Sequence, residues 1–480
     1  MQAPLDAIII GAGPAGSAAA ILLARAGWSV ALVERQRFPR RKVCGECLAA
    51  SNLPLLDLLG IGPAFQAVAG PDLRQVALLR GQRQVLADLP GATQDGQRWG
   101  RALGRETLDT LLLDQARAAG AQVLQPWSVQ AVHGGRGDWT LGLREMDTNA
   151  LLTLRAPVAI AAQGSWEGLP WERSQDRPWE VDWPAPDRRP TSAHDRSRRQ
   201  RRGAADLFAF KANFHHAAQA ESLLSVLALD GGYGGMVLAD GGITTVACCV
   251  RRDRLAACRR DEPGLRAGDA MEAWLMRSCD GVRQALTPAQ REGPWLAVGP
   301  LDPGIRVRAG DALFRIGNAA GEAHPIVGEG MSMALQSAWL LCAHLLGPQG
   351  IDAKGAGTPC FAATTAVPHA TIRSEAWQRA MAQRYATAWR RQFAPRLWLA
   401  AAFAHAAMRP TASGPLIALA RAWPGLLTQG ASWSGKTRGI ANPTALALPR
   451  RTRVTATQTP TLAPSSSRDK ATFNPREELP

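Results

Sequence analysis

Residues 11–16 read Gly11-Ala12-Gly13-Pro14-Ala15-Gly16, which is the pattern G-x-G-x-x-G. We expect an apolar strand directly before it, over residues 5–10, and an Ala-rich helix directly after it, over 14–26. In that setting the first glycine permits a tight turn, the second lets the backbone approach a pyrophosphate, and the third lets helix and strand pack closely. The free N–H groups at the helix start bind the anion. The stretch therefore predicts a Rossmann-type nucleotide-binding unit.

A second apolar strand is expected over residues 29–33, and it ends in Glu34. A carboxylate at this point accepts hydrogen bonds from a ribose 2′-OH and repels a 2′-phosphate. The same unit binds NAD and FAD, so the motif alone leaves the cofactor open.

The rest of the pattern predicts an α/β protein, α+β overall, in which an antiparallel sheet lobe interrupts the nucleotide-binding lobe. Short strand-like runs separated by Asp-Gly and Gly-Gly turns begin near residue 206, which is typical of an antiparallel sheet. A strand at 313–316 and an apolar helix at 332–346 return to the first lobe. The expected divisions are the nucleotide-binding lobe, first part, at 1–170; an Arg/Pro-rich excursion at 171–205; the sheet lobe, forming the substrate wall, at 206–295; the return segment at 296–346; a helical region at 347–442; and a disordered tail at 443–480.

Composition and charge favour a folded protein in the cytoplasm. Hydrophobic residues make up 46% of the chain and charged residues 20%, which excludes a disordered class. The net charge of +15 is partly local, because arginines crowd residues 188–202. Prolines in and beside that block favour a solvated loop, and no nucleic-acid motif accompanies it, so we predict no nucleic-acid partner. No basic leader or membrane-spanning run is evident.

The eight cysteines are scattered and do not predict a disulfide framework. Cys44-Gly45-Glu46-Cys47 matches C-x-x-C, but no second ligand pair stands at a zinc spacing, so we predict no metal site. A dithiol redox pair remains open.

A second motif decides the cofactor. Gly317-Asn318-Ala319-Ala320-Gly321 is followed, in order, by Pro325-Ile326-Val327-Gly328-Glu329-Gly330-Met331. This run resembles the G-D-A-A-G-x-x-x-P-x-x-G-x-G-M segment of the FAD-dependent oxidoreductases in the geranylgeranyl reductase and p-hydroxybenzoate hydroxylase-like monooxygenase superfamily. The loop 38–45 and the helix start 105–109 resemble that superfamily's F-P-R-x-K-x-C-G and R-x-x-L-D segments. Asn318 stands where the family has Asp.

The resemblance implies FAD as cofactor, with NADPH or NADH as a transient electron donor. A structural arginine at a helix start is the alternative for Arg105. His324 faces either the flavin or the core. Cys44 and Glu46, in the loop expected over the flavin, are the candidate catalytic residues, and a buried structural cysteine is the alternative for Cys44. The residues implied in FAD binding are Gly11, Gly13, Pro14, Ala15, Gly16, Glu34, Arg35, Lys42, Arg105, Gly317, Asn318, Gly328, Gly330 and Met331.

The resemblance also implies an enzyme. The first hypothesis is a monooxygenase, or related tailoring enzyme, acting on an apolar small molecule such as a polyketide or lipid. The second is a C=C reductase of an isoprenoid chain, and a non-catalytic FAD-binding sensor is the alternative from another class. The Trp-x-Trp-x-Ile-Pro signature of flavin halogenases is absent, so halogenation is not favoured. The substrate and the oligomeric state are left open.

Residues 397–423 admit two interpretations. They mix Leu, Ala and Phe with Trp398, Trp423 and several arginines. Tryptophans and arginines of this kind can form a peripheral membrane contact. The alternative, which the sequence favours, is a helix pair packed on the nucleotide-binding lobe.

Overall fold

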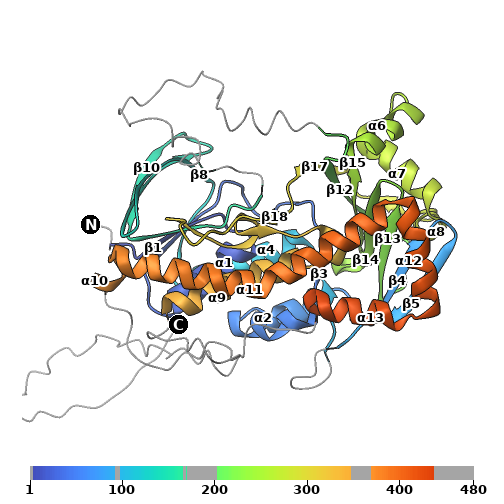
Figure 1. Ribbon diagram of the computed structural model, residues 1–480. Helices are drawn as coiled ribbons and strands as arrows, with labels where there is room; N and C mark the ends of the chain where they lie inside the picture. Colours follow the sequence, from blue (N-terminus) through green and yellow to red (C-terminus); the bar gives the residue numbers. More distant parts are fainter. Residues whose placement is uncertain (1–3, 92–97, 166–168, 170–202, 347–368, 437–480) are drawn as a thin grey trace, which may run out of the picture. The chain divides into compact units, whose positions relative to one another are not determined.

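The computed structural model describes residues 4–91, 98–165, 169, 203–346 and 369–436. A parallel sheet in the order β19-β11-β1-β2-β7 forms the centre of the nucleotide-binding lobe (Figure 1). Strands β1, β2 and β11 are buried along their whole length, which is why they are apolar on both faces. The strands are β1 (Ala7–Ile10), β2 (Val30–Val33), β7 (Gln122–Leu124), β11 (Val158–Ala161) and β19 (Phe314–Arg315).

Helices cover one face of this sheet and a second, antiparallel sheet covers the other. α1 (Pro14–Arg25), α4 (Arg105–Ala118) and α9 (Gly330–Leu346) share one apolar core with the short helices α2 (Leu53–Leu59) and α3 (Gly62–Val68). The opposite core joins Ile8 and Ile10 to Trp139 and Leu141 of the antiparallel sheet. That sheet consists of β8 (Trp127–Gly135), β9 (Asp138–Glu145) and β10 (Leu151–Ala156).

The sheet lobe has the strand order β16-β12-β15-β14-β13-β4-β5, and β17 also pairs with β12. All its pairings are antiparallel except the parallel pair of β13 and β4. Its strands are β4 (Gln75–Arg80), β5 (Arg83–Asp88), β12 (Leu207–His215), β13 (Leu223–Leu229), β14 (Gly232–Leu238), β15 (Thr244–Arg251), β16 (Gln290–Arg291) and β17 (Leu296–Leu301).

The sequence analysis differs from the structure at β4 and β5, which it placed in the first nucleotide-binding segment. Residues 76–79 of β4 are consecutively buried, so this strand needs cover on both faces. Ala77 and Leu79 pack in one core with α7 (Ala267–Ser278) and α8 (Asp280–Leu286), and Leu78 packs in another with α11 (Glu375–Met408) and α12 (Pro410–Ala422). Pairing with β13 places the strand inside the sheet lobe. The chain therefore enters the sheet lobe once before residue 206 and returns.

The two faces of the sheet lobe serve different purposes. Phe210, Ala212 and Phe214 of β12 pack against α6 (Arg252–Asp261), α7 (Ala267–Ser278) and α8 (Asp280–Leu286) in one apolar core. The alternate residues Ala209 and Lys211 point away from these helices, because successive side chains of a strand face opposite sides.

The C-terminal helices connect the lobes. α11 (Glu375–Met408) runs from the nucleotide-binding lobe to the sheet lobe, where α12 (Pro410–Ala422) and α13 (Gly425–Ala431) follow (Figure 1). Tyr385 and Trp389 belong to the first lobe's core, whereas Ala404 and Met408 belong to a core of the second. A short α10 (His369–Ile372) precedes α11, and η6 (Ser432–Lys436) follows α13.

The predicted fold class is confirmed: a Rossmann-type lobe interrupted by a largely antiparallel sheet lobe, with a helical C-terminal region. Most of the 171–205 excursion, its Arg block included, and the whole 443–480 tail lie outside the described residues.

Candidate active site

One cavity, of about 320 Å³, runs between the nucleotide-binding lobe and the inner face of the sheet lobe. Every residue that the sequence analysis singled out for FAD or for catalysis lines it, apart from Gly16. Segments that lie about 300 residues apart in the chain, at 11–15 and 317–331, thus meet at one place.

The glycine motif forms the floor of the cavity. Gly11 has a φ of +99°, and a Cβ there would lie 2.7 Å from the carbonyl oxygen of Ala162, so only glycine fits. A Cβ on Gly16 would lie 1.8 Å from the Gly11 carbonyl oxygen, which explains why Gly16 packs against the loop instead of lining the cavity. A Cβ on Gly13 would have no neighbour closer than Arg105, at 3.7 Å. Open space therefore remains in front of the α1 N-terminus.

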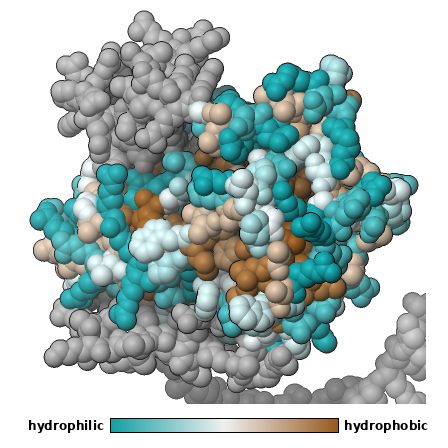
Figure 2. All heavy atoms as spheres, turned by 45° about the vertical axis from the view of Figure 1, so that its right-hand side comes forward, coloured by the Kyte–Doolittle hydropathy of each residue, from teal (hydrophilic) through white to brown (hydrophobic). Residues whose placement is uncertain are grey.

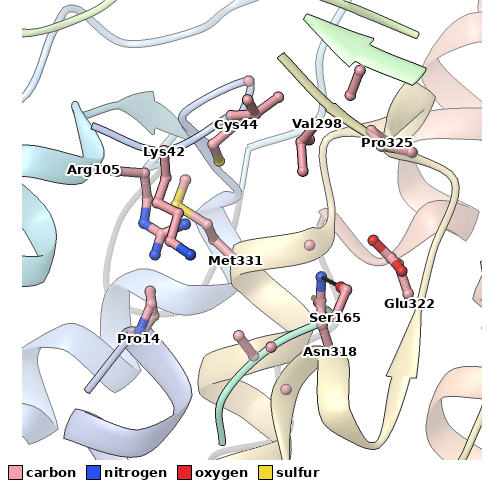
Figure 3. A pocket seen from close by; sticks show the side chains of 18 of the residues that line it. Pro14, Lys42, Cys44, Arg105, Ser165, Val298, Asn318, Glu322, Pro325 and Met331 are labelled. Carbon is pink, nitrogen blue, oxygen red and sulfur yellow. Dashed lines mark hydrogen bonds between the residues drawn. The ribbon is translucent and has the colours of Figure 1, made fainter. Parts of the chain in front are cut away.

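Cationic side chains border that space. Arg105 and Lys42 project side by side above Pro14, beside the sulfur of Met331 (Figure 3). Arg105 donates hydrogen bonds from Nε and Nη2 to Asp109, both at 2.7 Å. Burial by itself lowers the pKa of Arg105, but the attraction and hydrogen bonds of Asp109 raise it overall. Arg105 is thus a fixed cation that lines the cavity and also binds its own helix.

Glu34 lies at the end of β2, buried, where the sequence analysis placed the ribose contact. One carboxylate oxygen accepts a hydrogen bond from the Ala12 N–H and the other from the Gln36 N–H, each at 2.9 Å. Arg40 lies 3.6 Å from the same carboxylate. Glu34 therefore holds the glycine loop in place as well as facing the cavity.

The return segment closes the cavity from the other side. The Gly317 N–H donates to Ser337 Oγ at 2.7 Å, and Asn318 Nδ2 donates to Ser165 Oγ at 3.0 Å (Figure 3). α9 begins at Gly330, so its free N–H groups lie at the cavity wall with Met331. Gly328 has a φ of +66°, which turns the chain into this helix.

Glu46 is a candidate catalytic residue from the sequence, but in the structure both of its carboxylate oxygens already have partners. Its Oε1 forms an ion pair with Lys211 and accepts a hydrogen bond from the backbone N–H of Arg105 at 3.0 Å. Its Oε2 accepts a hydrogen bond from the Thr245 hydroxyl at 2.5 Å. Lys211 and Glu46 are 1% and 2% exposed, so the pair is buried between the lobes. These contacts favour a positioning role for Glu46.

Cys44 is half-buried, lines the cavity and accepts a hydrogen bond from the Glu46 N–H, with the sulfur 3.4 Å from the nitrogen. Its catalytic role stays a prediction. Among the described cysteines none forms a disulfide, and Cys47 is buried in β3 (Cys47–Leu48).

A tyrosine and two histidines stand at the far end of the cavity. Tyr233 of β14 lines it, 1% exposed, and its hydroxyl lies 3.2 Å from Nδ1 of His324. The ring of His324 lies 5.6 Å from that of His405, centroid to centroid, and His405 is exposed. Burial, and then His405, lowers the pKa of His324 to about 4. The three side chains thus lie next to one another, from the cavity wall at Tyr233 to an exposed histidine.

The remaining lining at this end is mostly apolar. Ala209, Val226, Val298, Leu301 and Ile326 line it, from four different elements of the sheet lobe and the return segment. Burial raises the pKa of the Cys249 thiol beside Tyr233 to about 12. Glu322 is the charged exception, and Arg306 donates to it at 3.1 Å.

These residues fit a dinucleotide at one end and an apolar molecule at the other. The open space at Gly13, the α1 and α9 N-termini and the cations Arg105 and Lys42 suit a pyrophosphate. In the part of the chain that is described, no cluster of His, Cys, Asp or Glu is placed to hold a metal ion. Nor is any described helix long and apolar enough to cross a membrane.

Residues 4–169 match the family model of an FAD binding domain. This match confirms FAD as the cofactor and identifies the first segment of the nucleotide-binding lobe as an FAD-binding domain. The resemblance to FAD-dependent flavoproteins is confirmed for this segment.

Curated relatives match part of the chain. A tryptophan 2-halogenase of Chondromyces crocatus is 37% identical over 127 residues, 26% of this chain and 24% of that protein. A menaquinone reductase of Mycobacterium tuberculosis is 34% identical over 128 residues, 27% of this chain and 30% of that protein. The chain thus spans less than a third of the length of these relatives.

Solved structures match over nearly the whole chain and show the fold. A myxobacterial chondrochloren halogenase superposes with a TM-score of 0.62 at 18% identity, covering 93% of this chain and 97% of that one. A geranylgeranyl bacteriochlorophyll reductase-like protein of Thermoplasma acidophilum gives 0.60 at 17% identity, covering 90% and 99%.

Sequence reasoning missed several residues of the site. Lys211 was the clearest available signal, since it is a lone cation within the apolar run 208–214. Asp240 caps α4 from the sheet lobe, accepting the Gly104 N–H at 2.6 Å and Thr107 Oγ1 at 2.8 Å. Nothing in the local sequence marks Asp240 as a cap, because it lies 136 residues from Gly104.

Proposed function

We propose that the protein is an FAD-dependent oxidoreductase acting on an apolar small molecule, with NADPH or NADH as electron donor. The observation that carries the proposal is the single cavity, which joins FAD-binding residues to the apolar inner face of the sheet lobe. Enclosed apolar pockets with a few polar groups are typical of small-molecule sites. Bound FAD supplies the electron transfer, and the protein supplies binding, orientation and protons.

Two chemistries fit this cavity, and one residue pair separates them. Reduction of a C=C or quinone system adds a hydride and a proton, so it needs an acid beside the substrate. Tyr233, hydrogen-bonded to His324 in an apolar surrounding, is placed to act as that acid. Burial, and then Cys249, raises the pKa of Tyr233, so the hydroxyl stays protonated until a strong base forms next to it. This pair favours reduction; monooxygenation, the first hypothesis from the sequence, remains the second candidate.

A proton path follows from the geometry. Tyr233 gives its phenolic proton to the substrate and recovers one from Nδ1 of His324. His324 then recovers a proton at Nε2 from solvent on the side of His405. The path takes up one proton from solvent for each proton delivered to the substrate; Tyr233 ends protonated as it began, and His324 ends neutral, with its proton moved from Nδ1 to Nε2.

The test is an anaerobic titration of the purified flavoprotein with NADPH and NADH, followed by O2 or by an apolar acceptor such as a short-chain menaquinone. Reduction followed by reoxidation with the acceptor supports the reductase. Reoxidation by O2 coupled to hydroxylation of an added apolar compound supports the monooxygenase. A flavin that no donor reduces supports a non-catalytic sensor.

Tyr233→Phe sharpens the choice, and Tyr385→Phe is its matched control. Tyr385 is also buried, but it donates to the Arg315 carbonyl and does not line the cavity. For a reductase we expect Tyr233→Phe to slow turnover about a hundredfold while flavin content and reduction by NADPH stay unchanged. Equal turnover in wild type and Tyr233→Phe would contradict the proton-donor role.

A further inference from the structure

The C-terminal helices expose large aromatic side chains. Trp398 of α11 and Trp423 at the end of α12 are each 68% exposed, and Trp433 of η6 is 61% exposed. Leu419 of α12 is 48% exposed. These elements contact one another: α12 and η6 pack against α11, and α13 packs against both α12 and η6. Figure 2, which turns the side with α12 and α13 forward, shows apolar surface gathered in the middle of this face and rimmed by hydrophilic residues.

From Arg391 to the C-cap Arg409, the exposed residues of α11 form one stripe. They follow one another at intervals of three or four, which places them on a single side of a helix. Trp398 stands in the middle of the stripe, and arginines stand at both of its ends. The stripe consists of Arg391, Pro395, Trp398, Ala402, His405 and Arg409.

The charged side chains of residues 376–434 are all cationic. Residues 376–434 contain no Asp or Glu and seven arginines: Arg379, Arg384, Arg390, Arg391, Arg396, Arg409 and Arg421. Of these, only Arg396 is buried, where it donates to Gln336. Asp88, at the end of the neighbouring β5, is an exposed acidic residue, and Arg83 at the start of the same strand is exposed too. An exposed cationic surface with tryptophans suits an anionic, partly apolar partner.

The inner side of the same helices is part of the cavity's surroundings. Ala404 and Met408 of α11 and Ile417 of α12 share an apolar core with Tyr233 and Cys249, which line the cavity. The exposed tryptophans and the apolar end of the cavity are therefore on opposite sides of one helical layer.

We propose that the outer face of α11, α12 and η6 docks on an anionic lipid bilayer without crossing it. Indole rings are favoured at the boundary between head groups and acyl chains, and arginines beside them attract anionic head groups. The surface then brings the apolar end of the cavity close to the bilayer, where an apolar substrate is dissolved. The proposal does not depend on which reaction the flavin performs.

The experiment is co-sedimentation of the full-length flavoprotein with vesicles of phosphatidylcholine, with and without phosphatidylglycerol. We expect binding to the mixed vesicles, weaker binding to phosphatidylcholine alone, and partial release by high salt. The double variant Trp398→Ala/Trp423→Ala should bind at least about tenfold more weakly, since each indole loses its apolar burial in lipid. Flavin absorbance should be unchanged and reports that the variant is folded.

Matched variants test the two components. Leu419→Ser should weaken binding, whereas Leu151→Ser, on the even more exposed Leu151 of β10, should not. Arg391→Gln/Arg409→Gln should weaken binding to the mixed vesicles, whereas Arg259→Gln/Arg260→Gln on α6 removes the same charge elsewhere and should not. Absence of binding by the wild-type protein overturns the proposal. So does a tryptophan variant that turns a dimer into a monomer in sedimentation velocity while vesicle binding is unaltered.

Discussion

The two lobes build their walls of the cavity from different material. The nucleotide-binding lobe contributes glycines without side chains, helix N-termini and the loop that Glu34 holds, with the cationic side chains of Arg105 and Lys42 beside them. The sheet lobe contributes side chains from alternate positions of strands, such as Ala209, Val226 and Tyr233. Backbone sites need particular residues at fixed spacing, because only glycine leaves the room. Side-chain walls accept many residues of similar size, so the first wall is fitted to one cofactor and the second can vary with the substrate.

The largest expected effect is at the backbone wall. Gly13→Glu places a carboxylate in the open space before α1, where a pyrophosphate would be repelled. We expect the purified variant to be folded and colourless, with FAD affinity lowered at least about a hundredfold. Flavin absorbance and circular dichroism measure the two properties.

Gly310→Glu is the control for Gly13→Glu. Gly310 lies in an exposed loop where an added Cβ meets nothing within 4 Å, so this variant should keep its flavin. A Gly13→Glu protein that folds and stays yellow would contradict the placement of the pyrophosphate, and with it the contrast between the walls.

The second effect is at the joint between the lobes. Lys211→Met leaves the buried Glu46 carboxylate without its cation, and we expect a loss of about 3–5 kcal/mol in the free energy of unfolding. Glu46→Gln/Lys211→Met removes both charges and should recover part of this loss. Urea denaturation of four proteins, namely the wild type, Lys211→Met, Glu46→Gln and the double variant, measures the coupling free energy between the two side chains.

An exposed ion pair gives the reference value for the loss of unfolding free energy in Lys211→Met. Arg379 and Glu375 of α11 lie 2.6 Å apart and are about 60% exposed, so Arg379→Met should cost less than about 1 kcal/mol. If Lys211→Met costs no more than Arg379→Met, the buried pair does not join the lobes.

The same contrast explains what the sequence predicted. The glycine motif and the run 317–331 correctly predicted the parallel sheet, α1, α9 and one end of the cavity. They did so because the glycines there are needed for tight turns and close approaches of the backbone. The four strands between residues 207 and 251 were found from their turns, without their partners. The sequence analysis wrongly assigned residues 296–301 to the return segment, because the pairing of β17 with β12 joins positions about 90 residues apart. β4 was assigned to the wrong lobe because its pairing with β13 is set by contacts about 150 residues away. Lys211, Asp240 and His324 act through partners that only the fold brings near.

The third effect is a pH dependence at the side-chain wall. The pKa of His324 is about 4 in the folded protein, against about 6.5 when unfolded. Between these values the unfolded chain binds more protons, so stability falls as the pH falls from 6.5 towards 4 and is fully retained above 6.5. The loss from this group alone is at most about 3 kcal/mol. His324→Asn should flatten the curve of melting temperature against pH in that window, and an unaltered curve would show that His324 is not buried beside Tyr233.

The smallest effect separates two roles of one carboxylate. Glu34 holds the Ala12 and Gln36 N–H groups and is also the expected ribose partner. Glu34→Ala loses both roles and should weaken FAD by about 1–3 kcal/mol. Glu34→Gln keeps one acceptor oxygen, so it can still hold one of the two N–H groups while the charge is gone. We therefore expect Glu34→Gln to lie between wild type and Glu34→Ala in a flavin titration. If Glu34→Ala binds FAD as tightly as wild type while its melting temperature drops, Glu34 serves only the glycine loop, and the backbone wall recognises the cofactor without this side chain.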